Sequence, residues 1–141
     1  LLNKSILVKF RTKYSPKIIS ISQEVFTNEQ NVDSQIDFDG QDSNAIHALV
    51  QQNDDYIGTG RMLQDGHIGR IAILKDFRNK GFGSDIVNAL VSEALDKGFK
   101  RVFLGSQLHA KGFYLKLGFS PYGDTYFEAN IEHILMEIKF S

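Results

Sequence analysis

One stretch decides how this chain folds, namely Ile71-Ala72-Ile73-Leu74-Lys75-Asp76-Phe77-Arg78-Asn79-Lys80-Gly81-Phe82-Gly83-Ser84. Its apolar beginning predicts the end of a strand, its middle is a basic loop rich in glycine, and a helix follows at once. The first turn of a helix carries backbone N–H groups without partners, and the helix dipole favours an anion at the same end. A strand, loop and helix of this kind therefore predict a site for a phosphate group.

The residues of this loop suit an anion. Gly81 and Gly83 allow the backbone to approach a phosphate without a Cβ in the way. Arg78 and Lys80 add positive charge, while Ser84 can either cap the helix or donate a hydrogen bond to an oxygen.

Two other phosphate-binding motifs do not fit the spacing of the loop. A Walker A loop needs a lysine directly after its second glycine, and here Ser84 follows Gly83. A dinucleotide fingerprint needs a third glycine or an alanine three residues after the second glycine, and that position is Ile86. On this stretch alone, a turn that only connects strand and helix stays open as an alternative.

A second motif lies further along the chain and reads Gln107-Leu108-His109-Ala110-Lys111-Gly112-Phe113-Tyr114-Leu115-Lys116-Leu117-Gly118-Phe119. It resembles the Asn-x-x-Ala-x-x-Phe-Tyr-x-x-x-Gly-Phe motif of GNAT acetyltransferases, with Gln107 where asparagine is usual. The loop from Arg78 to Gly83 resembles the Arg/Gln-x-x-Gly-x-Gly/Ala signature of the same superfamily. Segments 24–30, 36–37, 68–73 and 128–134 are similar to its ElaA/YjcF-like branch, so the resemblance covers nearly the whole chain.

The resemblance implies a GNAT fold of the α/β (α+β) class, with a mixed, mostly antiparallel central sheet flanked by helices. It also implies that the loop binds the pyrophosphate of acetyl-CoA and that the preceding strand pairs with the pantetheine arm. The expected cofactor-binding residues are Ile71, Ala72, Ile73, Arg78, Asn79, Lys80, Gly81, Phe82, Gly83, Ser84, Gln107, Ala110 and Tyr114. By analogy with other members, a homodimer is expected.

The implied activity is transfer of an acetyl group from acetyl-CoA to a primary amine of an unidentified small molecule or protein. Such a transfer needs a neutral amine, a stabilised carbonyl oxygen and a proton for the departing thiolate. The expected donor to the carbonyl oxygen is the backbone N–H of Ile73. The alternative is a GNAT-fold protein with weak catalysis that binds acyl-CoA or has a regulatory role.

Tyr114 stands at the superfamily's tyrosine position and is the expected proton donor. A phenol with an ordinary pKa of about 10 keeps its proton at neutral pH. His133 and Glu29 are the candidate bases, and Glu128 and His109 compete with them. A tyrosine packed in the core and a hydrogen-bonded structural histidine are the plainer alternatives for Tyr114 and His133.

The pattern of apolar residues predicts elements in the order β-α-β-β-β-α-β-α-β. The expected strands are residues 5–10, 45–51, 56–63, 67–74, 102–104 and 134–140. The expected helices are residues 16–26, a segment with an apolar repeat over residues 86–95, and residues 108–117. Residues 27–43 are polar and acidic, which predicts irregular structure.

The composition limits the classes of protein that fit. A chain of 141 residues, 42% hydrophobic, suits a single domain over residues 1–141. A formal net charge of -1 argues against nucleic acid as a partner, and no apolar run approaches the roughly 20 residues that span a bilayer. The absence of cysteine excludes disulfides, thiolate metal sites and cysteine nucleophiles, and it fits the cytoplasm.

The acidic segment from Asp33 to Asp42 has two interpretations. It is either a solvated loop or a site for a cation or polyamine near the acceptor. Its acidic residues lack the spacing of a calcium-binding loop, so no metal is expected.

Overall fold

The strands form two antiparallel sheets in the computed structural model, which describes residues 3–9, 14–29 and 44–140, with only the backbone course for residues 3–9, 15 and 27–29. The first sheet has the order β1 (Asn3–Lys9), β2 (Ile46–Gln52), β3 (Asp55–Met62) and β4 (Ile68–Ile73). The second has the order β5 (Arg101–Gln107), β7 (Ile131–Lys139) and β6 (Ser120–Glu128). The helices are α1 (Ser15–Ser22), which continues into the π-helix η1 (Gln23–Glu29), α3 (Phe82–Asp96) and α4 (Lys111–Lys116). Short 3-10 turns, η3 (Lys75–Phe77) and η4 (Leu108–Ala110), precede α3 and α4.

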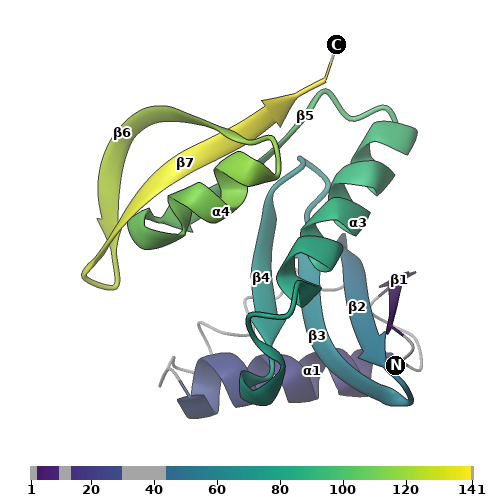
Figure 1. The fold of residues 1–141 in the computed structure, drawn as a ribbon. Helices are drawn as coiled ribbons and strands as arrows, with labels where there is room; N and C mark the ends of the chain where they lie inside the picture. The colour runs from purple at the N-terminus through teal and green to yellow at the C-terminus, as the bar shows by residue number, and fades with distance from the viewer. Residues whose placement is uncertain (1–2, 10–13, 30–43, 141) are drawn as a thin grey trace.

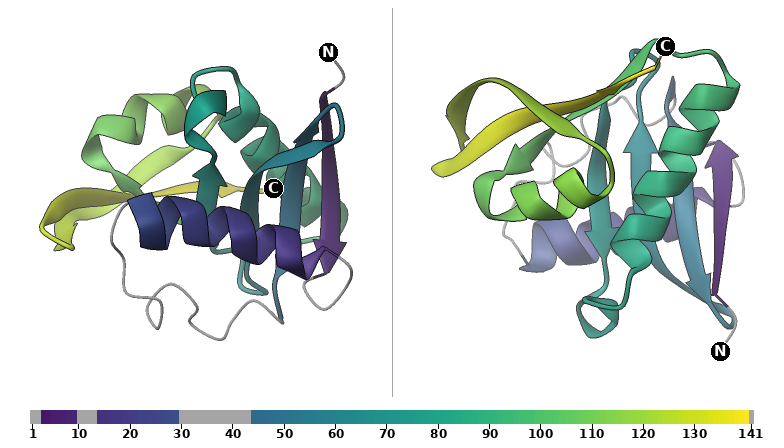
Figure 2. Two further views of the ribbon diagram at one scale, coloured as in Figure 1. Left: turned by 90° about the horizontal axis from the view of Figure 1, so that it is seen from below. Right: turned by 45° about the horizontal axis from the view of Figure 1, so that its top comes forward.

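Helices cover both faces of the first sheet (Figure 1, Figure 2). On one face, Ile86 and Leu90 of α3 are buried in a large apolar cluster that also contains Val50. On the other face, Ile18 of α1 packs in a smaller cluster with Leu49. Leu49 and Val50 are adjacent in β2 and enter different clusters because successive side chains of a strand point to opposite faces.

Among the described residues, one isolated bridge joins the backbones of the two sheets. An isolated parallel bridge joins His67 to Phe103, and their rings stack with centroids 4.9 Å apart. The backbone N–H of Phe103 donates to the carbonyl oxygen of Gly66, 3.0 Å away. Gly66 has a φ of 93°, and a Cβ there would overlap the Arg101 carbonyl oxygen. Beyond this bridge, β4 and β5 belong to separate sheets and diverge, as Figure 1 shows.

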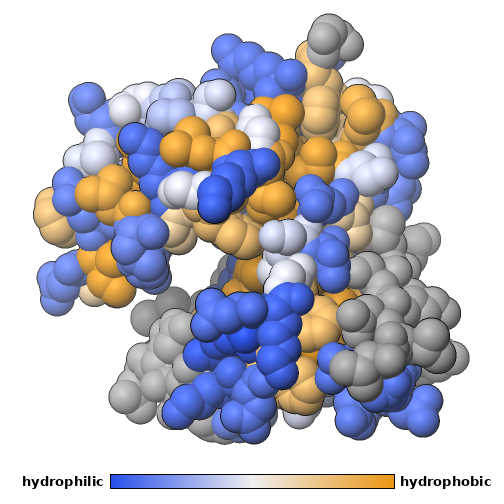
Figure 3. All heavy atoms as spheres, in the orientation of Figure 1, coloured by the Kyte–Doolittle hydropathy of each residue, from blue (hydrophilic) through white to orange (hydrophobic). Residues whose placement is uncertain are grey.

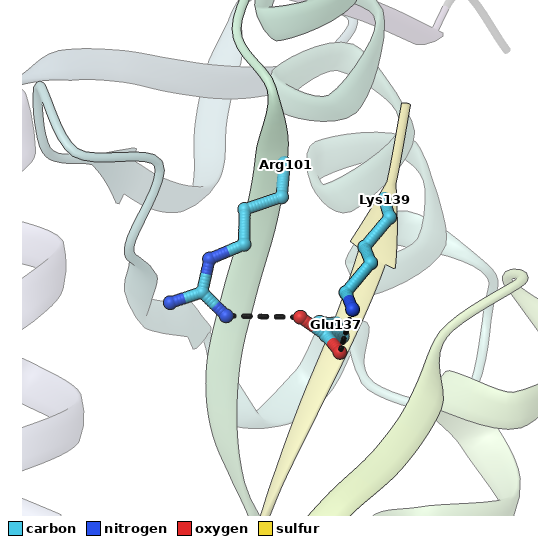
Figure 4. Close-up of polar contacts among 3 residues, drawn as sticks. All are labelled: Arg101, Glu137 and Lys139. Carbon is cyan, nitrogen blue, oxygen red and sulfur yellow. Dashed lines mark hydrogen bonds and ion pairs between the residues drawn. The ribbon is translucent and has the colours of Figure 1, made fainter. Parts of the chain in front are cut away.

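A network of three charged side chains ties β5 to β7 at the end remote from this divergence (Figure 4). Arg101 Nη1 lies 2.9 Å from Glu137 Oε1, and Lys139 Nζ lies 3.8 Å from Glu137 Oε2. The hydrogen bond to Glu137 raises the pKa of the Arg101 guanidinium. Because the pair is partly exposed, it contributes little to overall stability.

Within the residues that the structure describes, the predicted order of elements is correct except for one omission. The structure places strand β6 at Ser120–Glu128, where no strand was expected. This strand lies at the edge of its sheet, and most of its side chains are exposed. An edge strand tolerates Pro121 and needs no apolar alternation, so its sequence pattern is weak.

Several boundaries also differ from the expectation. The strand predicted at residues 102–104 extends over residues 101–107, and the last strand begins at Ile131 rather than at residue 134. Residues 27–29 are the end of η1, so the irregular structure expected from residue 27 is wrong for these three. The remaining residues of that segment, 30–43, lie outside the described residues. Leu95, expected on the apolar face of α3, is 59% exposed.

Candidate functional site

The glycine-rich loop has the backbone geometry of an anion cradle. Asn79 and Gly81 both adopt left-handed conformations, with φ of 63° and 88°. Gly81 is the N-cap of α3, and the first helical hydrogen bond runs from the N–H of Asp85 to its carbonyl oxygen. The backbone N–H groups of residues 82–84 therefore lie at the open end of the helix. A Cβ on Gly81 would meet no atom within 4 Å, so the loop surface is open at this point.

The side chains of the loop differ in what they can offer. Phe82 is only 2% exposed and anchors the loop in the large apolar cluster. Ser84 occupies the third position of the helix rather than the cap, so the expected capping role is wrong and its hydrogen-bond donor role stays a prediction. Asn79 and Lys80 are exposed, and Lys80 Nζ lies 5.8 Å from the centre of the Phe77 ring.

Strand β4 presents its last residue to the gap between the sheets. The N–H of Leu74 donates to the carbonyl oxygen of Ile57 on β3, and neighbouring residues of an antiparallel strand alternate in direction. The backbone groups of Ile73 therefore point away from β3. Its carbonyl oxygen accepts a hydrogen bond of 2.9 Å from Arg78 Nε. The intervening residue, Ala72, turns its side chain toward α1 and is buried.

A β-bulge interrupts β4 at Arg70. Thr59 pairs with Ala72 and Arg61 pairs with Gly69, so Arg70 and Ile71 together oppose one residue of β3. Arg70 has a φ of 54°, which costs about 1–3 kcal/mol for a residue other than glycine. Bulges redirect side chains, and here the Arg70 guanidinium lies 4.5 Å above the Phe26 ring. Burial lowers the pKa of Arg70.

A cavity of about 340 Å³ occupies the gap between β4 and β5. The hollow is visible in Figure 3, between the lobe of β6, β7 and α4 and the lobe of β4 and α1. It brings together five of the predicted site residues, Ile71, Gln107, Ala110, Tyr114 and His133. It is also lined by Phe26, Arg70 and Ser106, to which the sequence assigned no role. No local pattern indicates a role for these three residues, because the packing of η1, the bulge in β4 and the divergence of the strands bring them to the gap.

Tyr114 enters this cavity from α4. Its ring makes edge-to-face contacts with Phe113 and Phe119, with centroids 4.9 Å and 5.8 Å apart. Burial raises the pKa of its phenol. The hydroxyl therefore stays protonated at neutral pH and can donate a proton or a hydrogen bond.

His133 is held on β7 in a defined orientation. Its Nδ1 lies 2.7 Å from the carbonyl oxygen of Ile131, and its ring stacks on Tyr126 with centroids 5.5 Å apart. Because a carbonyl oxygen can only accept, Nδ1 carries the proton and Nε2 of the neutral ring is an acceptor. Nε2 lies 3.9 Å from Glu128 Oε2.

The other candidate bases, Glu128, His109 and Glu29, differ in their position relative to the cavity. Glu128 lines it, whereas His109 is exposed on η4 and does not. The backbone of Glu29 ends η1, and its side chain lies outside the described residues, as does the acidic segment from Asp33 to Asp42. In the described part of the chain, no three His, Asp or Glu side chains gather as a metal site. Nor does any helix there have the length and apolarity to cross a bilayer.

Comparison with known proteins places the chain among acetyltransferases. A family model described as an acetyltransferase (GNAT) domain matches residues 11–140. The YyaT protein of Bacillus subtilis strain 168 is 36% identical over 129 residues, 87% of each chain. The N-acetyltransferase YjcF of the same strain is 33% identical over 120 residues, 82% of this chain and 86% of its own. The crystal structure of Escherichia coli ElaA is 26% identical with a TM-score of 0.83, over 96% of this chain and 99% of its own. The resemblance to the ElaA/YjcF-like branch and the expected fold are confirmed.

Proposed function

Because the chain belongs to the GNAT acetyltransferase family, we propose that residues 1–141 form one domain that transfers an acetyl group from acetyl-CoA to a primary amine. The observation that carries this proposal is the gap between β4 and β5, which has an anion cradle beside one end of β4. The cradle and the strand edge are joined by the bond from Arg78 to Ile73. The remaining residues expected to bind acetyl-CoA lie around the same gap.

The residues present fit acetyl-CoA as a co-substrate. The N–H groups at the start of α3, with Arg78 and Lys80, would hold the pyrophosphate, since the left-handed Asn79 and Gly81 leave the loop surface concave and open. The outward carbonyl oxygen of Ile73, which has a second lone pair beside the one that accepts from Arg78, would accept a hydrogen bond from an amide N–H of the pantetheine arm. Gln107 and Ala110 border the cavity further along.

Different residues around the gap can carry out the separate proton transfers that the reaction needs. His133 Nε2 would take a proton from the ammonium group, so that the amine nitrogen can attack the thioester carbonyl. The backbone N–H of Ile73 would stabilise the negative charge on the carbonyl oxygen. As the carbon–nitrogen bond forms and the carbon–sulfur bond breaks, Tyr114 would give its proton to the thiolate. The nitrogen, which still carries two protons, would lose one of them to solvent, and the tyrosine phenolate would take a proton from solvent in turn. The products are the acetylated amine and CoA.

The acid and the base of this scheme lie on different faces of the second sheet. Tyr114 packs against the large cluster that contains Ile134 and Met136. His133 precedes Ile134 on β7, so its side chain points to the opposite face. An amine can therefore approach His133 without crossing the space beside Tyr114.

Calorimetry with acetyl-CoA, CoA and ATP tests the proposal, followed by thiol release with acetyl-CoA and a panel of amines. We expect saturable binding of acetyl-CoA and CoA but not ATP, with thiol release that depends on an amine. Gly83→Val, which places a branched side chain in the first turn of α3, should abolish CoA binding. Binding without release from any amine would instead support a protein that binds acyl-CoA with weak catalysis. No binding of either coenzyme form would reject both functions.

A further inference from the structure

A second cavity, of about 330 Å³, adjoins the first. The two cavities share five lining residues, Ile68, Gly69, Arg70, Gly105 and Glu128. Since these residues come from β4, β5 and the end of β6, the cavities meet in the gap between the sheets. A molecule in the second cavity can therefore reach the site of acetyl transfer.

The second cavity opens on the face of the sheets opposite to α3. Phe103 and Leu135 line it, whereas their neighbours Leu104 and Met136 are buried in the cluster beneath α3. Arg61 also lines it, and a small hollow between Arg61 and α1 lies against Ile18. The loop at the start of α3 lies on the other face, so a second substrate would enter from the side of α1.

The charges around this cavity are of both signs. Arg61, which is 7% exposed, and Arg70 contribute two guanidinium groups from β3 and β4. Each guanidinium has five N–H donors, so it can bind an anionic ligand in addition to a partner within the protein. The carboxylate of Glu128 stands at the junction of the cavities, 3.9 Å from Nε2 of His133. An ammonium group at this carboxylate would be beside the base that the reaction requires.

The uncharged walls are partly aromatic. The stacked rings of His67 and Phe103 form one side. Tyr126 of β6 reaches over β7 to Gly105 of β5, where an added Cβ would overlap its hydroxyl group. A cavity of this volume is at the small end of the range for small-molecule sites, and it suits a compact ligand with an apolar side chain.

We propose, on the basis of the acetyl transfer proposed above, that the acceptor is a small zwitterionic amine of the amino-acid type. Arg61 and Arg70 bind its carboxylate, and Glu128 attracts its ammonium group toward His133. The aromatic walls hold its apolar side chain. This assigns specificity to residues that the family signature does not contain.

Calorimetry on the CoA-saturated protein tests this assignment with pairs of amines that differ only by a carboxylate. The pairs are L-phenylalanine with 2-phenylethylamine, L-leucine with 3-methylbutylamine, and L-tyrosine with tyramine. At least one amino acid should bind about 10- to 100-fold more tightly than its counterpart, because its carboxylate forms charge-assisted hydrogen bonds that the counterpart cannot form. Arg70→Gln and Arg61→Gln should remove this preference, while Lys97→Gln, at an exposed position after α3, should keep it. If Arg61→Gln does not fold, Arg70→Gln decides alone.

The two proposals fail in different ways. Equal binding of both members of every pair, or a preference that survives in Arg70→Gln, would overturn the zwitterionic acceptor. Thiol release only with the amines that lack a carboxylate would overturn it too and would leave acetyl transfer intact. If CoA does not bind, the same titrations on the free protein measure the preference, and only the transfer is rejected.

Discussion

Arg78 Nε donates a hydrogen bond to the carbonyl oxygen of Ile73 over 2.9 Å, so the loop that starts α3 is fastened to the end of β4. The guanidinium can keep this bond and still present other N–H groups to a phosphate, because its donors form a rigid fork. A lysine at this position has a single flexible ammonium group. This ammonium group would have to bind either the carbonyl oxygen of Ile73 or the phosphate.

Arg78→Lys should therefore weaken CoA binding about tenfold although the charge is retained. Arg78→Gln, which removes the charge as well, should weaken it further. Calorimetry measures both dissociation constants, and Lys97→Gln is the control for loss of a distant positive charge. A dissociation constant of Arg78→Lys equal to that of the wild type would show that the directed bond is not needed.

The two glycines of the loop should respond oppositely to alanine. Gly81 has a φ of 88°, so Gly81→Ala should lower the free energy of unfolding by about 1–2 kcal/mol, even though space for the methyl group is open. Gly83 lies within the helix, and its added Cβ would sit 3.5 Å from Phe113 Cζ, an ordinary contact. Gly83→Ala should therefore be neutral or up to about 1 kcal/mol stabilising. Urea unfolding measures both, and equal effects would contradict the backbone conformations described.

Tyr114→Phe should lower kcat about 100-fold and change the CoA dissociation constant less than about twofold. The phenylalanine ring can keep the edge contacts with Phe113 and Phe119, while the proton donor is lost. Steady-state kinetics and calorimetry separate the two quantities. A collapse of affinity with unchanged turnover per bound coenzyme would mean that Tyr114 only packs against the cofactor.

Stability at alkaline pH should reveal the burial of Tyr114. Its folded-state pKa is raised above the ordinary value of 10.0, so its stabilising contribution is complete below pH 10 and is lost as the pH rises through the raised pKa. Tyr126 contributes in the same direction, since burial raises its pKa as well. Urea unfolding between about pH 8 and pH 11 should show a decline that is shallower in Tyr114→Phe than in the wild type. An identical decline in the two proteins would show that the Tyr114 phenol is exposed to water in the folded state.

The roles of His133 and Glu128 can be distinguished by a matched pair of substitutions. His133→Gln should lower kcat about 100-fold, because Nε2 is the proposed proton acceptor. Glu128→Gln should mainly raise KM for the amine, because the carboxylate attracts the ammonium group without removing its proton. If Glu128→Gln lowers kcat more than His133→Gln does, the base is Glu128.

Those parts of the molecule that depend on local sequence could be predicted. The spacing of Gly81 and Gly83 and the positive charges between strand and helix predict the loop before α3. The structure has this loop, with Gly81 in a left-handed conformation at the N-cap of α3. Strand β6 could not be predicted, because an exposed edge strand that contains Pro121 and Gly123 has no apolar alternation. The bulge at Arg70 could not be predicted either, since tertiary packing rather than residue type imposes a left-handed arginine.

The same reason limits what the sequence says about the site. Tyr114 and His133 are 19 positions apart and lie on different elements, and both line the cavity between the sheets. Tyr114 was found through a motif, but Arg61 and Tyr126 belong to no motif. They reach the second cavity because β3 and β6 carry them there.

The bridge between His67 and Phe103 has a consequence for how a ligand would bind. Leu104 of β5 and Met136 of β7 are buried in the same cluster as α3, so the packing of the core keeps the two edge strands apart. Folding fixes β4 and β5 at this separation, so the conformational entropy of ordering them is lost before a ligand binds. A ligand that enters meets a preorganised slot and has no strands to separate. We therefore expect that separation of β4 and β5 takes nothing from its affinity.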